Sequence, residues 1–126
     1  MAGLLTISPW QLGLRFALEI TSLVGLWAGS GAIAPAFVRG WLPIALPIIA
    51  LALWTTFAVR DDPSRSGRAP FPVPGWLRLV LELAVFGGGA VGLAVAQWWI
   101  AFGLFCIASG VHHFGSRGRL AWLIRQ

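Results

Sequence analysis

The chain has 126 residues, of which 58% are hydrophobic and 10% are charged, and its mean hydropathy is +0.82. Soluble domains carry about 25% charged residues, so this composition excludes an ordinary soluble domain and indicates a single membrane domain. The net charge is +5, but the arginines lie at the ends of apolar segments and do not cluster on a polar surface, so no nucleic-acid partner is expected.

Four apolar segments follow one another along the chain, and each approaches the ~20 residues that are needed to cross a bilayer. They lie at about 10–30, 40–59, 75–96 and 98–115. The sequence therefore predicts an all-α fold, an integral membrane bundle of four helices with the lipid bilayer as its partner.

The first segment could instead be a secretory signal peptide, since Ala34-Pro35-Ala36 has the small residues of a cleavage site. We reject this alternative because Glu19 would lie within the apolar region of the signal. The pattern around Glu19 also returns in the third segment, in the body of the protein.

The distribution of arginines predicts the orientation. Four spans place the N-terminus, the loop at 60–74 and the C-terminus on one side of the membrane. Eight of the nine arginines lie on that side, and Arg39 alone lies on the other. Positive residues accumulate on the cytoplasmic side, so both termini are expected in the cytoplasm.

We expect one transmembrane domain made of two repeats. The first repeat covers about residues 9–59, a turn-forming cytoplasmic linker covers 60–74, and the second repeat covers about 75–115. Residues 116–126 mix arginines with large apolar residues, which predicts an amphipathic tail on the inner leaflet.

The repeats share the string Leu-Arg-x-x-Leu-Glu-x5-Gly-x3-Gly, whose two copies are separated by 63 residues. The copies place ionisable and small residues at matching positions: Arg15, Glu19, Gly25 and Gly29 in the first, and Arg78, Glu82, Gly88 and Gly92 in the second. At about 100° per residue, each set occupies one helix face. Small residues allow close helix packing and charges must face the interior, so the first and third helices should be central.

Because the repeats share an orientation, they predict a pseudo-two-fold axis along the membrane normal. Arg15 would then pair with Glu82 and Arg78 with Glu19, in a neutral cluster of four charges. The cluster is either a structural clamp, which we favour, or part of a transport pathway.

His112 and His113 lie at the depth of this cluster, at the end of the fourth segment. Adjacent helical residues point about 100° apart, so at most one faces inward. Such a histidine could carry a proton or bind haem or a metal, but a histidine at the helix end is the favoured interpretation. The single Cys106 is expected to be a small buried side chain. No metal, cofactor or catalytic motif is indicated, and we expect no enzyme.

The chain resembles the YrdB-like family of small four-helix bacterial membrane proteins, whose function is not established. The segments that carry the likeness are Leu14 to Glu19, Leu42-Pro43 through Trp54, and Trp76 to Phe86. The resemblance covers about residues 9 to 115. It implies four spans in the bacterial plasma membrane and transfers no catalytic residue.

Two other membrane classes fit poorly. Small multidrug-resistance exporters have a similar glutamate in the first helix but lack this strong charge bias, and fluoride channels need pore asparagines, which this chain lacks. We therefore expect a structural or accessory membrane protein whose outer faces meet a partner, in a homodimer or in a larger membrane complex. The alternative is a small proton-coupled transporter or channel that uses Glu19 and Glu82.

Overall fold

The computed structural model describes residues 7–64 and 69–126. The described part is all-α, as the sequence predicted, apart from one pair of two-residue strands. In chain order the elements are α1 (Pro9–Ile33), α2 (Ala36–Arg39), α3 (Leu42–Thr56), β1 (Phe57–Ala58), β2 (Phe71–Pro72), α4 (Gly75–Val95), α5 (Trp99–Gly115) and α6 (Arg117–Ile124).

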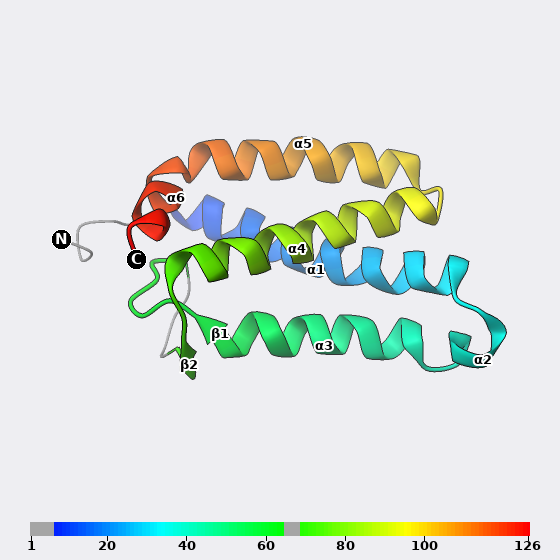
Figure 1. Cartoon of the computed structure of the whole chain (residues 1–126). Coiled ribbons are helices and arrows are strands. Elements are labelled where there is room, and N and C mark those ends of the chain that lie inside the picture. The colour runs from blue at the N-terminus through cyan, green and yellow to red at the C-terminus, as the bar shows by residue number, and fades with distance from the viewer. Residues whose placement is uncertain (1–6, 65–68) are drawn as a thin grey trace.

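Helices α1 and α4 form the centre of the molecule, with α3 along one side and α5 along the other (Figure 1). The contact between α1 and α4 is the most extensive of all, which agrees with the small-residue face predicted for these two helices. Their apolar core contains Leu18, Val85, Phe86 and Leu93. The start of α1, the two strands and α6 all lie at one end of the molecule.

Glycines bring the backbones of α1 and α4 together. A Cβ added to Gly25 would overlap the backbone of Gly89, and one added to Gly29 would overlap that of Gly92. Gly88, which we predicted at this contact, would meet only the tip of a leucine side chain at 3.2 Å. Gly88 therefore borders the contact, while the closest backbone approach falls on Gly89, which is turned about 100° from Gly88 and lies nearer the centre of the buried face.

The apolar helices differ in length. Helices α1 (25 residues) and α4 (21 residues) are long and apolar enough to cross a membrane, while α3 and α5 are shorter apolar helices. The second span, expected to reach residue 59, ends earlier as a helix, because α3 stops at Thr56 and the chain continues as the strand β1. Large apolar side chains cover the outside of the molecule. Cys106 is among the exposed residues of α5, so the expectation that it is buried was wrong.

The C-terminal segment forms α6, but its apolar residues pack against the protein. Leu123 is fully buried and Trp122 nearly so, in a small cluster with Val59 and Leu79. Gly75, at the start of α4, allows this close approach, since a Cβ there would overlap the carbonyl of Leu123. The expected tail on the lipid surface is therefore corrected to a helix that packs against the start of α4.

The three consecutive glycines of α4 provide a matched test of this packing. We expect Gly89→Ala to destabilise the protein by about 1–3 kcal/mol, because its Cβ would meet the backbone of Ser22 on α1. Gly87→Ala should be neutral or stabilising by up to about 1 kcal/mol, since among the described residues no atom outside its own helix lies within 4 Å of the added carbon. Thermal unfolding in detergent measures both variants. Equal effects at Gly87 and Gly89 would contradict the assigned crossing.

Candidate functional site: a buried charge cluster

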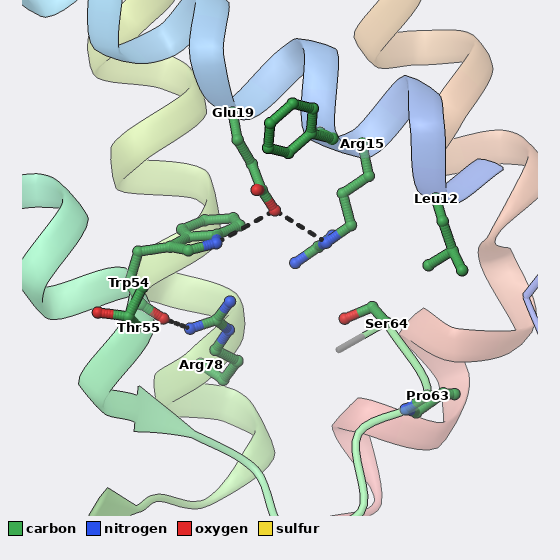
Figure 2. Close-up of a pocket in the computed structure, with 9 residues that line it drawn as sticks. Leu12, Arg15, Glu19, Trp54, Thr55, Pro63, Ser64 and Arg78 are labelled. Atoms are coloured by element: carbon green, nitrogen blue, oxygen red, sulfur yellow. Dashed lines mark hydrogen bonds and ion pairs between the residues drawn. The ribbon is translucent and has the colours of Figure 1, made fainter. Parts of the chain in front are cut away.

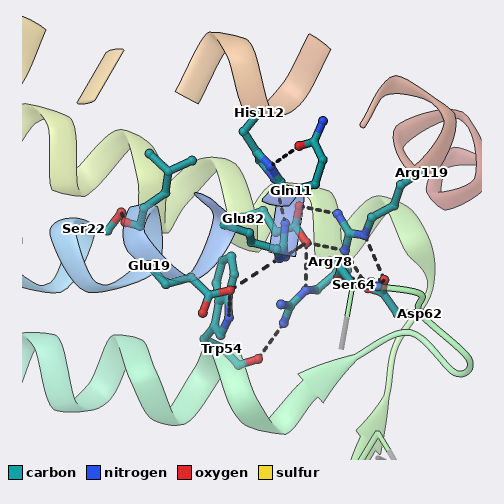
Figure 3. Close-up of polar contacts among 12 residues, drawn as sticks. Gln11, Glu19, Ser22, Trp54, Asp62, Ser64, Arg78, Glu82, His112 and Arg119 are labelled. Carbon is teal, nitrogen blue, oxygen red and sulfur yellow. Dashed lines mark hydrogen bonds and ion pairs between the residues drawn. The ribbon is translucent and has the colours of Figure 1, made fainter. Parts of the chain in front are cut away.

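Glu82, in the second turn of α4, is the centre of a cluster of charges (Figure 3). Its side chain has no exposed surface. One oxygen, Oε1, accepts hydrogen bonds from Arg15 Nη2 at 2.7 Å, Arg78 Nε at 3.2 Å and Arg119 Nη2 at 2.6 Å. The other, Oε2, accepts one from Arg119 Nη1 at 3.1 Å. Four charged hydrogen bonds therefore hold this carboxylate in place.

Arg119 and Asp62 enlarge the cluster beyond the four residues that the repeat predicts. Arg119, on α6, binds Asp62 through two parallel hydrogen bonds, Nε to Oδ1 at 2.8 Å and Nη2 to Oδ2 at 2.6 Å. Asp62 also accepts hydrogen bonds from the backbone and hydroxyl of Ser64 at 2.9 and 2.8 Å. With Arg15, Arg78 and Glu19, the cluster contains three arginines and three carboxylates, so it is neutral.

The surroundings of Asp62 and Arg119 keep both groups charged. Burial by itself raises the pKa of the Asp62 carboxyl, but the hydrogen bonds and charge of Arg119, together with the hydrogen bonds of Ser64, outweigh burial and hold the pKa below its ordinary value. Burial by itself lowers the pKa of the Arg119 guanidinium, yet its hydrogen bonds to Asp62 and Glu82 raise the pKa above its usual range.

The structure makes one of the two expected pairs between repeats and not the other. Arg15 pairs with Glu82, but Arg78 turns away from Glu19 and donates from Nη1 to the carbonyls of Trp54 at 2.6 Å and Phe57 at 2.7 Å. These carbonyls belong to the C-terminal end of α3, where the backbone lacks helical partners. Glu19 contacts Arg15 Nε at 3.4 Å and accepts a hydrogen bond from Trp54 Nε1 at 3.1 Å.

Trp54 makes the surroundings of Glu19 and Glu82 different. Its ring lies under both guanidinium groups, with the central carbon of Arg78 at 4.3 Å and that of Arg15 at 5.0 Å from the ring centroid. The second repeat offers no equivalent contact to Glu82, whose neighbours are arginines. The two copies of the motif therefore have different surroundings: Glu82 is fully buried, whereas 26% of the Glu19 side chain is exposed.

His112 faces inward and His113 is half-buried beside it. His112 Nε2 lies 3.5 Å from Arg15 Nη1, and its Nδ1 lies 3.1 Å from Gln11 Oε1. Because arginine only donates, Nε2 accepts and Nδ1 carries the proton, which describes a neutral imidazole. His113 Nδ1 bonds the carbonyl of Ser109 at 2.7 Å, within its own helix. Among the described residues, no group of His, Cys, Asp or Glu has the arrangement of a metal site.

Sequence reasoning missed Gln11, Trp54, Asp62 and Arg119. Arg119 is one of several arginines that we used only to orient the chain, and Asp62 follows another aspartate in a polar loop. Asp62 lies in a loop and Arg119 on the C-terminal helix, and no spacing in the sequence relates them to the charged face of α1 and α4. Their contacts therefore depend on the tertiary fold.

An open groove of about 500 Å³ lies beside the cluster, between α1 and the end of α3. Figure 2 shows Arg15, Glu19, Trp54 and Arg78 along it. Its outer wall includes Leu12 and Phe16 of α1, and both side chains are exposed. The groove therefore joins charged groups from the cluster to an apolar surface.

Comparison with known proteins identifies related sequences. A family model described as a protein of unknown function (DUF2568) matches residues 13–109. The uncharacterized protein YrdB of Bacillus subtilis (strain 168) is 34% identical over 120 residues, which cover 95% of this chain and 98% of YrdB. No solved structure matches the chain. The resemblance to YrdB-like proteins that the sequence indicated is confirmed.

The repeated motif offers a matched pair of substitutions. Glu82→Gln should destabilise the protein by about 3–5 kcal/mol, because it leaves buried arginines without their shared carboxylate. Glu19→Gln should cost less than about 1 kcal/mol, since this carboxylate is partly exposed and makes few contacts. Unfolding in detergent measures both. If both variants lose equal stability, the two copies are equivalent and the asymmetric cluster is wrong.

The Asp62–Arg119 pair should make stability depend on pH in a defined direction. The pKa of Asp62 in the folded protein lies below its ordinary 3.8, so its contribution is complete above that pH and is lost as the pH falls through the lower folded value. Asp62→Asn should cost roughly 1.5–3 kcal/mol at neutral pH, the range for a charged hydrogen bond. The difference in melting temperature between wild type and this variant should shrink in acid. Asp61→Asn, at an exposed neighbour, is the control.

Proposed function

Because the chain belongs to the DUF2568 family of proteins of unknown function, we propose a role from the cluster itself: a small multi-pass membrane protein with a structural or accessory role, whose buried charges act as a clamp. No enzymatic activity forms part of this proposal. The clamp joins α1, α4, the linker and α6 at one end of the molecule. A rigid, closed end of this kind suits a protein that presents its surface to a partner or to a second copy of itself.

The observation that carries the proposal is the saturation of Glu82. Its carboxylate has no exposed surface and accepts four hydrogen bonds from three arginines. A transport site needs a group that exchanges a proton or an ion with water, and a carboxylate with this environment offers no such exchange. The Glu82 carboxylate is instead suited to holding the ends of α1, α4 and α6 together.

The placement in the membrane rests on composition and shape. Helices α1 and α4 have the length and hydropathy of spans. The 15 residues of α3 reach only about 22 Å, at 1.5 Å per residue, against a hydrocarbon core of about 30 Å. Apolar residues extend both short apolar segments beyond their helices: Phe57–Ala58 follow the end of α3, and Trp98 precedes the start of α5. We propose four spans, as two hairpins of the same orientation, with the charged end and both termini in the cytoplasm of a bacterial cell.

Transport remains the second candidate because Glu19, unlike Glu82, borders the open groove. A proton or cation site would then use Glu19 alone, with Arg15 beside it. The unequal surroundings of the two glutamates make this alternative separable from the clamp by experiment.

Cysteine labelling tests the orientation. On a Cys106→Ala background, Gln97→Cys in the exposed turn between α4 and α5 should react with a membrane-impermeant maleimide in intact cells. Gln126→Cys should react only after the cells are permeabilised. The opposite pattern, or labelling of both positions in intact cells, would show that the proposed topology is wrong.

Proteoliposomes test the role. Wild-type protein should give no proton or cation flux above that of empty vesicles, because the clamp holds its charges in place. A flux that Glu19→Gln abolishes, in a variant that still folds, would replace the clamp with a transport function.

A further inference from the structure

The groove beside Glu19 separates two opposite charges that the sequence expects to be paired. Glu19 lies on its α1 wall and Arg78 on its α4 side, and both line the space of about 500 Å³ (Figure 2). Among the described residues, Arg78 forms its ion pair with Glu82, and Glu19 forms its own with Arg15. The groove thus presents a carboxylate and a guanidinium that do not neutralise each other directly.

Each of these groups keeps unused hydrogen-bonding capacity. Glu19 uses Oε1 toward Arg15 and Trp54, while its Oε2 accepts no hydrogen bond from the described residues. Arg78 uses Nε and Nη1, while its Nη2 has no acceptor within the part of the chain that the structure describes. An acceptor and a donor of opposite charge therefore remain available beside one groove.

A ligand that suits this pair carries both charges. An ammonium group would bind the free oxygen of Glu19, and an anionic phosphate oxygen would bind Arg78 Nη2. A purely anionic ligand would leave the free oxygen of Glu19 without a donor, and a purely cationic one would leave Arg78 Nη2 without an acceptor. A zwitterion with a primary ammonium a few bonds from a phosphate satisfies both sides, and phosphoethanolamine has this chemistry.

The apolar wall of the groove favours a lipid as the source of this headgroup. Phe16 is 64% exposed and Leu12 is 38% exposed, on the side of α1 that faces away from the core. In the proposed topology, which this inference depends on, these side chains lie where acyl chains meet the headgroups. We propose that the groove binds phosphatidylethanolamine, with Glu19 on the ammonium, Arg78 on the phosphate, and Leu12 and Phe16 along the acyl chains.

Lipid-dependent melting of the full-length protein in detergent tests this proposal. The probes are phosphatidylethanolamine and phosphatidylglycerol of the same acyl chains. The concentration of phosphatidylethanolamine that gives half of the maximal stabilisation should be about tenfold lower than that of phosphatidylglycerol, which corresponds to one charged hydrogen bond. Glu19→Gln should remove this preference, so that the two lipids become equivalent.

Asp61→Asn is the matched control, because it removes a carboxylate from the same end of the molecule at an exposed position outside the groove. It should retain the preference. Equal stabilisation of the wild type by the two lipids, or an unchanged preference in Glu19→Gln, would overturn the headgroup site. Stabilisation by free O-phosphoethanolamine at the same concentration as the lipid would overturn the lipid as its occupant.

The outcome is separable from the proposed function. A failed lipid preference leaves the clamp, measured by Glu82→Gln, and the topology, measured by cysteine labelling, as they stand. Failure of the labelling pattern would instead remove the membrane placement on which the lipid site depends.

Discussion

A carboxylate with no exposed surface carries a large desolvation cost, and Glu82 is such a group at the end of an apolar helix. Its cost is offset only if cations reach it with good geometry. The chain supplies them from three elements: Arg15 from α1, Arg78 from α4 itself and Arg119 from α6. The relative positions of these elements at this end of the molecule follow from that requirement.

Arg119 in turn needs a second carboxylate, because its guanidinium is buried and extends beyond Glu82. Asp62 of the linker provides this carboxylate, and the hydrogen bonds of Ser64 orient the aspartate. The part of the linker around Asp62 and Ser64 is thereby held against α6, and the apolar side of α6 packs on α4 through Leu123. The buried charges and this apolar contact together hold the loop residues and the terminal helix against the end of the molecule.

The internal repeat gives similar sequences but different surroundings. Gly89 contacts Ser22 of α1, while the matching position in the first copy is Leu26. Trp54 of α3 contacts Glu19, while Glu82 is enclosed by arginines. As a result, one copy of the motif is a closed structural centre, and the other faces a groove. A duplicated motif can in this way acquire two roles within one small chain: the proposed clamp and the proposed lipid site.

Part of this structure was determined by the sequence alone. Apolar runs of helix length produce the helices, and the shared face of charges and glycines predicts that α1 and α4 meet, because buried charges and close backbone packing both require the interior. The Arg15–Glu82 contact follows from the same argument. Within-helix spacing is local geometry, so a sequence is sufficient to read it.

Only the tertiary structure decided which partners complete the cluster. Arg78 bonds the carbonyls at the end of α3 in place of Glu19, and Asp62 and Arg119 come from segments without any periodic pattern. Such contacts depend on where a loop and a terminal helix return to α1 and α4, and no residue spacing encodes that position. The sequence therefore determined the central helices and the presence of a charge cluster, while the fold determined its six members and its asymmetry.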